Sequence, residues 1–343
     1  MDTPSTALGS EWLSFHIVYH TGNRDRLLTD LVRPTVRALR QEGKLESFFF
    51  LRHVLGGPHI RLRIRPSPGS RDAVREGVRK RAASYLSSFP SPAQVSGSAA
   101  RLLEESLQHQ ESEERQQAAL ADNSIHEIPF EPELERYGGP ERIGKSLDFF
   151  ALSSARALRL LDHRATVTAG EWLTVALRLE ARYVLGFADD VADLASLIAE
   201  PQATLEAGEE LIRARADQAF AESGDRLVGL LRGEIEKLGL AALSPLEDGE
   251  VARSLRRELA DADRATRTRI FASQIHMTAN RLGLARAEEA YVARILWRTF
   301  QRLEEADPAT WSDLGDLLVC RTAREPSPAR RLSDLLAPAF ATL

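Results

Sequence analysis

Cysteine is almost absent from this chain. The single residue, Cys320, excludes an internal disulfide and a metal site built from cysteines. Long apolar runs are also missing, so no segment approaches the length of a membrane-spanning helix. Positive charge is not in excess: a net charge of −5 and a pI near 6.0 disfavour a global surface for nucleic acid. We therefore expect a globular protein with no direct nucleic-acid partner and no membrane partner.

Several signatures of common enzyme classes are missing as well. The sequence contains no P-loop, no G-x-G-x-x-G and no G-x-S-x-G, so nucleotide-driven chemistry and the common serine-hydrolase plan lack support. The N-terminal segment MDTPSTALGSEW has neither the basic nor the apolar region of a signal peptide, and we expect a cytoplasmic protein. Neither a cofactor nor a metal ion is expected.

The first part of the chain alternates between strand and helix patterns. After a flexible N-terminus at residues 1–10, it predicts an α/β lobe over residues 11–138. The elements follow the order β-α-β-β-α-β, which is the ferredoxin-like pattern. An inserted, solvated helix near 97–121 precedes the last strand. The strands are expected at 12–20, 46–54, 59–65 and 125–131, and the helices at 23–42 and 70–88.

Helical periodicity dominates after residue 138 and predicts a larger helical lobe over residues 139–343. The fold class is therefore α+β. Few linker-like residues separate the lobes, so we expect one integrated domain with a shared core. The helices are expected at about 141–162, 169–199, 205–223, 225–238, 248–282 and 286–304.

The strand HIRLRIR, residues 59–65, is the most informative segment. Its strict alternation places the aliphatic side chains on one face and Arg61, Arg63 and Arg65 on the other, together with His59. Guanidinium groups repel each other, so they suit either open water or an anionic ligand such as a carboxylate. A solvated face is the plainer of these two interpretations.

Two further segments carry residues suited to chemistry. Glu133 and Arg136 precede a Gly-Gly turn, where functional residues often lie, although a surface ion pair is the plainer interpretation. His276 and Asn280 are four residues apart and share one face of a predicted helix. Histidine suits proton transfer near neutral pH, although a histidine among apolar neighbours is more often a core residue.

The segment Asp189-Asp190-Val191-Ala192-Asp193 matches the D-D-x-x-D metal motif of isoprenoid synthases. The motif is short, and no second magnesium-binding motif follows it. We therefore expect an exposed helix face here rather than a metal site.

Four blocks of the sequence, taken together and in order, resemble the thiopeptide-type bacteriocin biosynthesis family, which is related to the elimination domain of lanthipeptide dehydratases. The resemblance spans about residues 11–305. Phe130 departs from the pattern, because the family usually has tyrosine at this place. The blocks are FFFLRHVLGGPHIRLRI at 48–64, FEPELERYGG at 130–139, DFFALSS at 148–154 and HMTANRLG at 276–283.

This resemblance implies an enzyme that removes glutamate from glutamylated serine or threonine and leaves dehydroalanine or dehydrobutyrine. The family's two arginines, glutamate and histidine would correspond to Arg61 or Arg63, Arg136, Glu133 and His276, with Arg61 the preferred strand arginine. All of these are expected to meet at one cationic cleft. Substrate binding is assigned to Arg52, His59, Tyr137, Asn280 and Arg281.

The resemblance also implies the partners of the protein and two alternative functions. The expected substrate is a ribosomally made, glutamylated precursor peptide, and a separate tRNA-dependent protein would attach the glutamate. A homodimer is left open. Relatives of this family include pyridine synthases, which join two dehydroalanines by a formal [4+2] cycloaddition, so this activity is the first alternative. A non-catalytic subunit that only presents the precursor peptide is the second.

Overall fold

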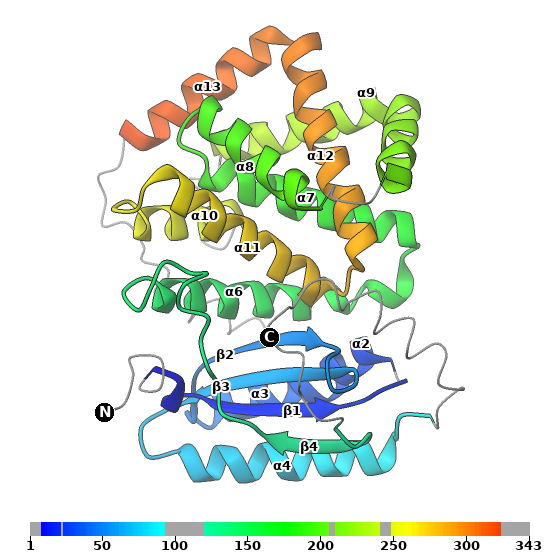
Figure 1. Ribbon diagram of the computed structural model, residues 1–343, viewed down its shortest axis with the longest axis vertical. Coiled ribbons are helices and arrows are strands. Elements are labelled where there is room, and N and C mark those ends of the chain that lie inside the picture. Colours follow the sequence, from blue (N-terminus) through cyan, green and yellow to red (C-terminus); the bar gives the residue numbers. More distant parts are fainter. Residues whose placement is uncertain (1–7, 22, 93–119, 206–209, 241–247, 324–343) are drawn as a thin grey trace. The chain divides into compact units, whose positions relative to one another are not determined.

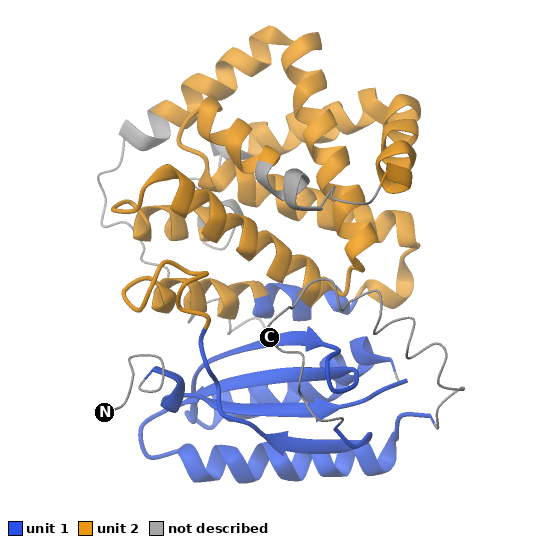
Figure 2. Ribbon diagram, viewed as in Figure 1, with its two compact units in different colours: residues 1–132, 154–162, 343 blue, residues 133–153, 163–342 orange. Residues whose placement is uncertain are grey.

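The computed structural model describes residues 8–21, 23–92, 120–205, 210–240 and 248–323. The chain forms two compact units (Figure 2). The first contains residues 1–132 and 154–162, and the second contains residues 133–153 and 163–342. The predicted N-terminal segment 1–10 and inserted helix 97–121 lie largely outside the described residues.

The first unit is built on a four-stranded antiparallel sheet (Figure 1). Its strand order is β2-β3-β1-β4, so the chain leaves the sheet and returns to it between β1 and β2 and again between β3 and β4. The strands are β1 (Leu13–Val18), β2 (Leu45–His53), β3 (His59–Pro66) and β4 (Ser124–Glu127). The ends of β1, β2 and β3 lie within two residues of the predicted ranges, whereas β4 ends four residues before the predicted end at residue 131.

One face of this sheet forms an apolar core. The alternation along the strands places aliphatic and aromatic side chains on that face, where helices α3 and α4 contact β2, β1 and β4. The buried strand residues of this core are Phe15, Ile17, Phe48, Phe50, Ile60, Leu62 and Ile64. Its other face carries His16 and the arginines of β3, together with Phe49 and Leu51 of β2.

The two helical connections match the predicted helices at 23–42 and 70–88. The first is continuous but irregular: α2 (Arg24–Arg26), a π-helical segment (Leu27–Val32) and α3 (Arg33–Gln41) follow one another. Pro34 sits in the first turn of α3, where its missing N–H costs little. Gly43, with φ of 67°, ends this helix as expected. The second is α4 (Arg71–Ser88).

The last part of helix α6 (Ile143–Leu161) belongs to the first unit, although the helix begins in the second. The hydroxyl of Ser154 accepts a hydrogen bond of 3.2 Å from the backbone N–H of Phe50, on edge strand β2. Asp162 forms an ion pair with Arg33. The hydrogen bond from Phe50 satisfies one backbone group of an edge strand that would otherwise be open to pairing.

The second unit is helical. Besides the start of α6, it contains α7 (Ala169–Phe187), α8 (Val191–Leu205), α9 (Glu210–Leu240), α10 (Asp248–Glu258), α11 (Arg264–Leu282), α12 (Arg286–Ala306) and α13 (Pro308–Ala323). Within the described ranges, no helix combines the length and apolar character that a bilayer crossing requires.

Four predicted helix ranges were wrong in their extent: 169–199, 248–282, 205–223 and 225–238. The range 169–199 is interrupted between α7 and α8, and 248–282 is interrupted between α10 and α11, where Asp263 caps the new helix. Conversely, Gly224 does not end a helix, because α9 runs through it. Helix α13 was not predicted. The α+β class and the small antiparallel sheet are confirmed, while the ferredoxin-like assignment stays an interpretation of the element order.

Candidate functional site

Strand β3 is the centre of the polar sheet face. In the antiparallel register, Arg61 stands opposite His16 on β1, and Arg63 stands opposite Ser14 on β1 and Phe49 on β2. Arg61 and Arg63 are only 8% and 6% exposed. The plainer interpretation of a solvated face is therefore wrong for these two arginines, and their charges are held in a shielded environment.

Aromatic rings surround Arg63. Its guanidinium carbon lies 4.7 Å from the centroid of Phe130 and 5.6 Å from that of Phe49. Trp12 packs edge-on against both rings. The ring faces are electron-rich, so this group of aromatics stabilises a guanidinium that has left bulk water.

Three imidazoles lie next to Arg61 on the same face. The rings of His16 and His59 stack with centroids 4.8 Å apart, and His53 packs edge-on against His59 at 5.0 Å. Burial lowers the pKa of His16 to about 2 and that of His59 to about 3, so both rings are neutral. Arg61 Nε donates to His59 Nε2 over 3.4 Å, and His59 Nδ1 lies 2.7 Å from the carbonyl oxygen of Gly57. His59 therefore orients Arg61.

Arg65 lies on this face of β3, whereas Arg52 stands opposite Ile60 and therefore lies on the other, helix-covered face of the sheet. Arg52 forms a 2.5 Å ion pair with Asp25 of α2. Arg65 is paired with Glu46 at 3.1 Å and lies over the ring of Trp12. Both are thus held by acidic partners within the first unit, and Arg61 and Arg63 remain the more shielded cations of the strand.

In the second unit, the segment from Glu133 to Gly139 forms the turn that the sequence indicated. Gly138 and Gly139 have φ angles of 81° and 93°, which favour glycine. A side chain at Gly138 would also come within 3.0 Å of Arg142 and 3.2 Å of Ile270. The turn is therefore fixed both by backbone conformation and by close packing against α11.

Arg136 contacts both Ser273 of α11 and Glu133 of its own turn. Its Nη1 lies 3.1 Å from a carboxylate oxygen of Glu133, which is the predicted local ion pair. Its Nε donates a 2.7 Å hydrogen bond to the hydroxyl of Ser273. Tyr137 also bonds to Ser273, and burial raises the pKa of Tyr137 to about 12, so its hydroxyl keeps its proton. Ser273 thus ties the Gly-Gly turn to helix α11.

Arg281 lies deeper on the same helix. It is fully buried, its guanidinium carbon is 4.6 Å from the centroid of Phe150, and the Tyr137 ring packs edge-on against Phe150. Burial lowers the pKa of Arg281 to about 9, which still leaves it charged at neutral pH. Arg281 is a buried cation behind the turn.

His276 lies one turn after Ser273, on the same side of α11. Its Nδ1 is 2.9 Å from both carboxylate oxygens of Glu289, on α12. The Glu289 side chain is 7% exposed and that of His276 is 33% exposed. Asn280 follows one further turn along the helix. His276 is therefore not a simple core histidine, because it joins a buried carboxylate to an accessible surface.

Ser273, Glu289 and the buried Glu180 of α7 were not identified from the sequence. Ser273 and Glu289 lie far along the chain from their partners, and no local spacing marks them. Glu180 had a signal: it interrupts a run of apolar residues that are buried on α7. Burial, followed by the charge of Glu289, raises the pKa of Glu180 well above its usual value.

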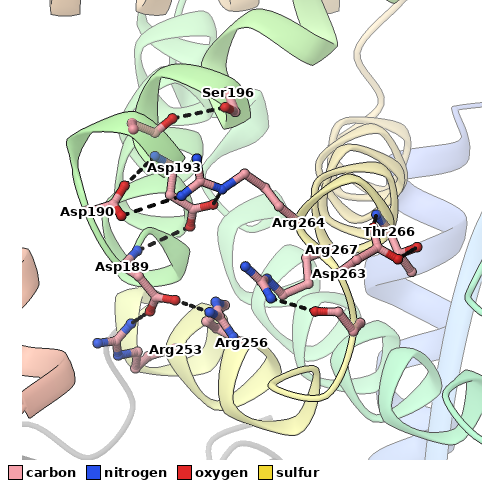
Figure 3. A network of polar contacts seen from close by, with 12 residues as sticks. Asp189, Asp190, Asp193, Ser196, Arg253, Arg256, Asp263, Arg264, Thr266 and Arg267 are labelled. Atoms are coloured by element: carbon pink, nitrogen blue, oxygen red, sulfur yellow. Dashed lines mark hydrogen bonds and ion pairs between the residues drawn. The ribbon is translucent and has the colours of Figure 1, made fainter.

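The D-D-x-x-D segment has a structural role (Figure 3). Asp190 Oδ1 accepts from the backbone N–H of Asp193, and Asp193 Oδ2 accepts from that of Asp189, so the motif caps the start of α8. Asp189 pairs with Arg253 and Arg256. The expected exposed face is wrong, because Asp193 is buried. The structure, within its described ranges, holds no group of three or more acidic, histidine or cysteine residues suited to a metal ion.

The predicted residues therefore fall into two groups, each within one unit. Strand β3 and its neighbours carry Arg52, His59, Arg61 and Arg63, whereas the Gly-Gly turn and α11 carry Glu133, Arg136, Tyr137, His276, Asn280 and Arg281. The expectation that both groups serve one cationic cleft stays a prediction.

Comparison with known proteins points to one family. Residues 12–300 match the family described as "Lantibiotic biosynthesis dehydratase C-term". No match was found among curated proteins.

Three solved structures are similar in fold to this chain. The pyridine synthase TbtD from thiomuracin biosynthesis shares 22% identity at a TM-score of 0.66, over 86% of this chain and 98% of TbtD. The tRNA-dependent lantibiotic dehydratase MibB from Microbispora sp. 107891 shares 22% identity at a TM-score of 0.58, over 90% of this chain and 29% of MibB. TsrL shares 18% identity at a TM-score of 0.55, over 92% of this chain and 99% of TsrL.

Proposed function

The chain belongs to the lantibiotic biosynthesis dehydratase C-terminal family, and we propose that it eliminates glutamate from glutamylated serine and threonine residues of a ribosomally made precursor peptide. The products are dehydroalanine and dehydrobutyrine. The enzyme is then a carbon–oxygen lyase that needs no cofactor.

The reaction is a β-elimination. A base removes the Cα proton of the esterified residue, and the electron pair forms the Cα–Cβ double bond. The Cβ–O bond breaks, and its electrons leave with the carboxylate of glutamate. Negative charge builds on the neighbouring amide oxygen before the ester departs, so a fixed cation near that oxygen lowers the barrier.

The residues of the two groups suit these tasks. We assign proton transfer to His276 and the binding of the leaving carboxylate or of the amide oxygen to Arg136 and the strand arginine, with Arg61 preferred to Arg63. Glu133 would bind the glutamyl ammonium group. We assign support of substrate binding to His59, Tyr137, Asn280 and Arg281, whereas Arg52, also expected in this role, lies on the opposite face of the sheet from Arg61 and pairs with Asp25.

One observation carries the proposal: helix α11 presents a histidine backed by a carboxylate and, one turn earlier, the serine that anchors Arg136. A base and a guanidinium held on one helix are what proton abstraction next to a carbonyl needs. A subunit that only presents a peptide has no use for a buried carboxylate behind an accessible imidazole.

Incubation with a glutamylated peptide and, separately, with a peptide that already carries dehydroalanines tests this function by mass spectrometry. Loss of glutamic acid from the first peptide is the expected result. His276→Gln and Arg136→Ala should leave the glutamylated peptide unchanged. Complete dehydration by either variant contradicts the role given to that residue.

Pyridine synthesis is the second candidate, because the fold similarity to TbtD extends over 98% of that enzyme. A formal [4+2] cycloaddition between two dehydroalanines expels no glutamate and has no need of a cation for a leaving carboxylate. Ring closure in the dehydroalanine peptide, with no reaction of the glutamylated one, favours this candidate over elimination.

The proposed reaction also defines partners. A separate protein must attach glutamate from glutamyl-tRNA, which places the reaction in the cytoplasm, and the precursor peptide passes from that protein to this one. The net charge of −5 suits a chain that binds the peptide and not the tRNA.

A further inference from the structure

A carboxylate pair lies behind His276 in the second unit. Glu289 comes from α12 and Glu180 from α7, and both are buried. The turn between α11 and α12 sets the contact between Glu289 and His276. Gly283, with φ of 78°, ends α11, and Glu289 follows in the first turn of α12. The register of this helix pair brings Glu289 to the Nδ1 edge of the imidazole.

The geometry defines which ring nitrogen is available. Both oxygens of Glu289 lie 2.9 Å from His276 Nδ1. An ionised carboxylate only accepts hydrogen bonds, so Nδ1 must carry a proton, and in the neutral ring Nε2 then carries the lone pair. Because the carboxylate is shielded and the imidazole is partly exposed, Nδ1 faces the protein interior.

Glu180 is the second member of this buried pair. Two buried carboxyl groups that interact cannot both ionise without a large cost. Burial raises the pKa of Glu180 well above its usual value, and the charge of Glu289 adds to the rise. The raised pKa favours the protonated form of Glu180, while Glu289 has His276 Nδ1 at hydrogen-bond distance.

We propose that Glu289 is a positioning residue that holds His276 as the Nδ1–H tautomer and leaves Nε2 to exchange the Cα proton of the substrate. The role of Nε2 rests on the proposed elimination, whereas the Nδ1–H tautomer rests only on the contact between His276 and Glu289. Glu289 acts through His276 and fixes the orientation and tautomer of its ring, as carboxylates do behind other catalytic histidines.

Glu289→Gln tests this role because it keeps the shape and removes the charge, while its amide can donate to Nδ1 and favour the other tautomer. Glu288→Gln is the matched control: it is the same substitution at the adjacent position, where the side chain caps the backbone N–H of Ala285. Glu289→Asp keeps the charge and serves as the conservative rescue. Thermal unfolding of each variant separates positioning from folding.

The first measurement is ¹⁵N NMR of histidine-labelled protein at a pH where His276 is neutral, with its signals identified by their loss in His276→Gln. We expect Nδ1–H in the wild type and in Glu288→Gln, and a rise of the Nε2–H form in Glu289→Gln. An Nε2–H tautomer in the wild type overturns the proposal, even if Glu289→Gln does not fold.

The second measurement is the rate of glutamate loss. For Glu289→Gln we expect kcat to fall on the order of 100-fold with KM unchanged, the size of an acid–base contribution, and partial recovery in Glu289→Asp. Equal rates in Glu289→Gln and Glu288→Gln overturn the positioning role. If the wild type releases no glutamate, the proposed function fails. The tautomer measurement still tests whether Glu289 holds His276 as the Nδ1–H form.

Discussion

The guanidinium carbon of Arg63 lies 4.7 Å from the centroid of the Phe130 ring. Phe130 stands where the family usually has tyrosine. Its ring also packs edge-on against Trp12 and Phe49. The contact between Phe130 and Arg63 is therefore a cation–π contact with the ring, which does not require the hydroxyl of a tyrosine.

Phe130→Leu should lower the free energy of unfolding by about 1 kcal/mol, because aromatic pairs and a cation–π contact are lost. Phe130→Tyr keeps both contacts and should be tolerated. Denaturant unfolding measures the effect, and Phe89→Leu is the control, since Phe89 is 62% exposed. Equal loss of stability in Phe89→Leu and Phe130→Leu argues against the Arg63 contact.

Arg136→Lys should slow glutamate loss at least about 10-fold, because an ammonium cannot reproduce the fork that reaches Ser273 and Glu133 together. Arg136 is on the surface side of the turn, so the free energy of unfolding should change little. Steady-state kinetics of the glutamylated peptide measure the effect. Arg302→Lys, on an exposed part of α12, is the control, and a rate unchanged in both variants removes Arg136 from the reaction.

The strands were predictable because their period-two pattern is local. HIRLRIR identified both faces of β3, and the Gly-Gly-Pro turn identified the hairpin with β2. The break between α7 and α8 was not predicted, because the D-D-x-x-D segment was treated as a metal motif or an exposed face. It is a helix cap, in which Asp190 and Asp193 bond to backbone N–H groups.

The candidate site was predictable only in part, for a related reason. His276 and Arg136 belong to recognisable blocks, but their partners Glu289 and Ser273 are defined by helix packing between distant segments. Burial was also misjudged at Arg61 and Arg63. Charge and alternation mark a polar face, and they do not tell whether aromatic rings and imidazoles will cover it.

Asp189→Asn should lower the free energy of unfolding by about 3 kcal/mol, because it leaves the buried Arg253 and its neighbour Arg256 without their shared carboxylate. Asp162→Asn removes the partner of Arg33 at a more exposed site and should cost less than about 1 kcal/mol. Denaturant unfolding compares the two. A similar small loss in both variants contradicts a structural role for Asp189.

Glu180→Gln should change the pH dependence of stability. Burial and the charge of Glu289 raise the pKa of Glu180 above the usual 4.5. The unfolded chain releases this proton as the pH rises through 4.5, while the folded chain keeps it, so wild-type stability falls in that direction. The glutamine of the variant does not titrate, so this contribution to the pH dependence of stability is absent from the variant.

The advantage of Glu180→Gln in free energy of unfolding should therefore grow as the pH rises above 4.5 and vanish below it. Unfolding over a series of pH values measures this difference. Glu304→Gln, on the exposed side of α12, is the control. A constant difference at all pH values contradicts a raised pKa of Glu180 in the folded chain.

The most direct test of the central claim uses a glutamylated peptide that carries deuterium at Cα of the esterified serine. With the purified chain alone, we expect release of glutamate together with loss of the deuterium, and a dehydroalanine product whose rate of formation depends on the isotope. Release of glutamate with the deuterium retained and serine restored means ester hydrolysis, and an unchanged peptide means no activity on this substrate. Either of these two results contradicts elimination by this protein.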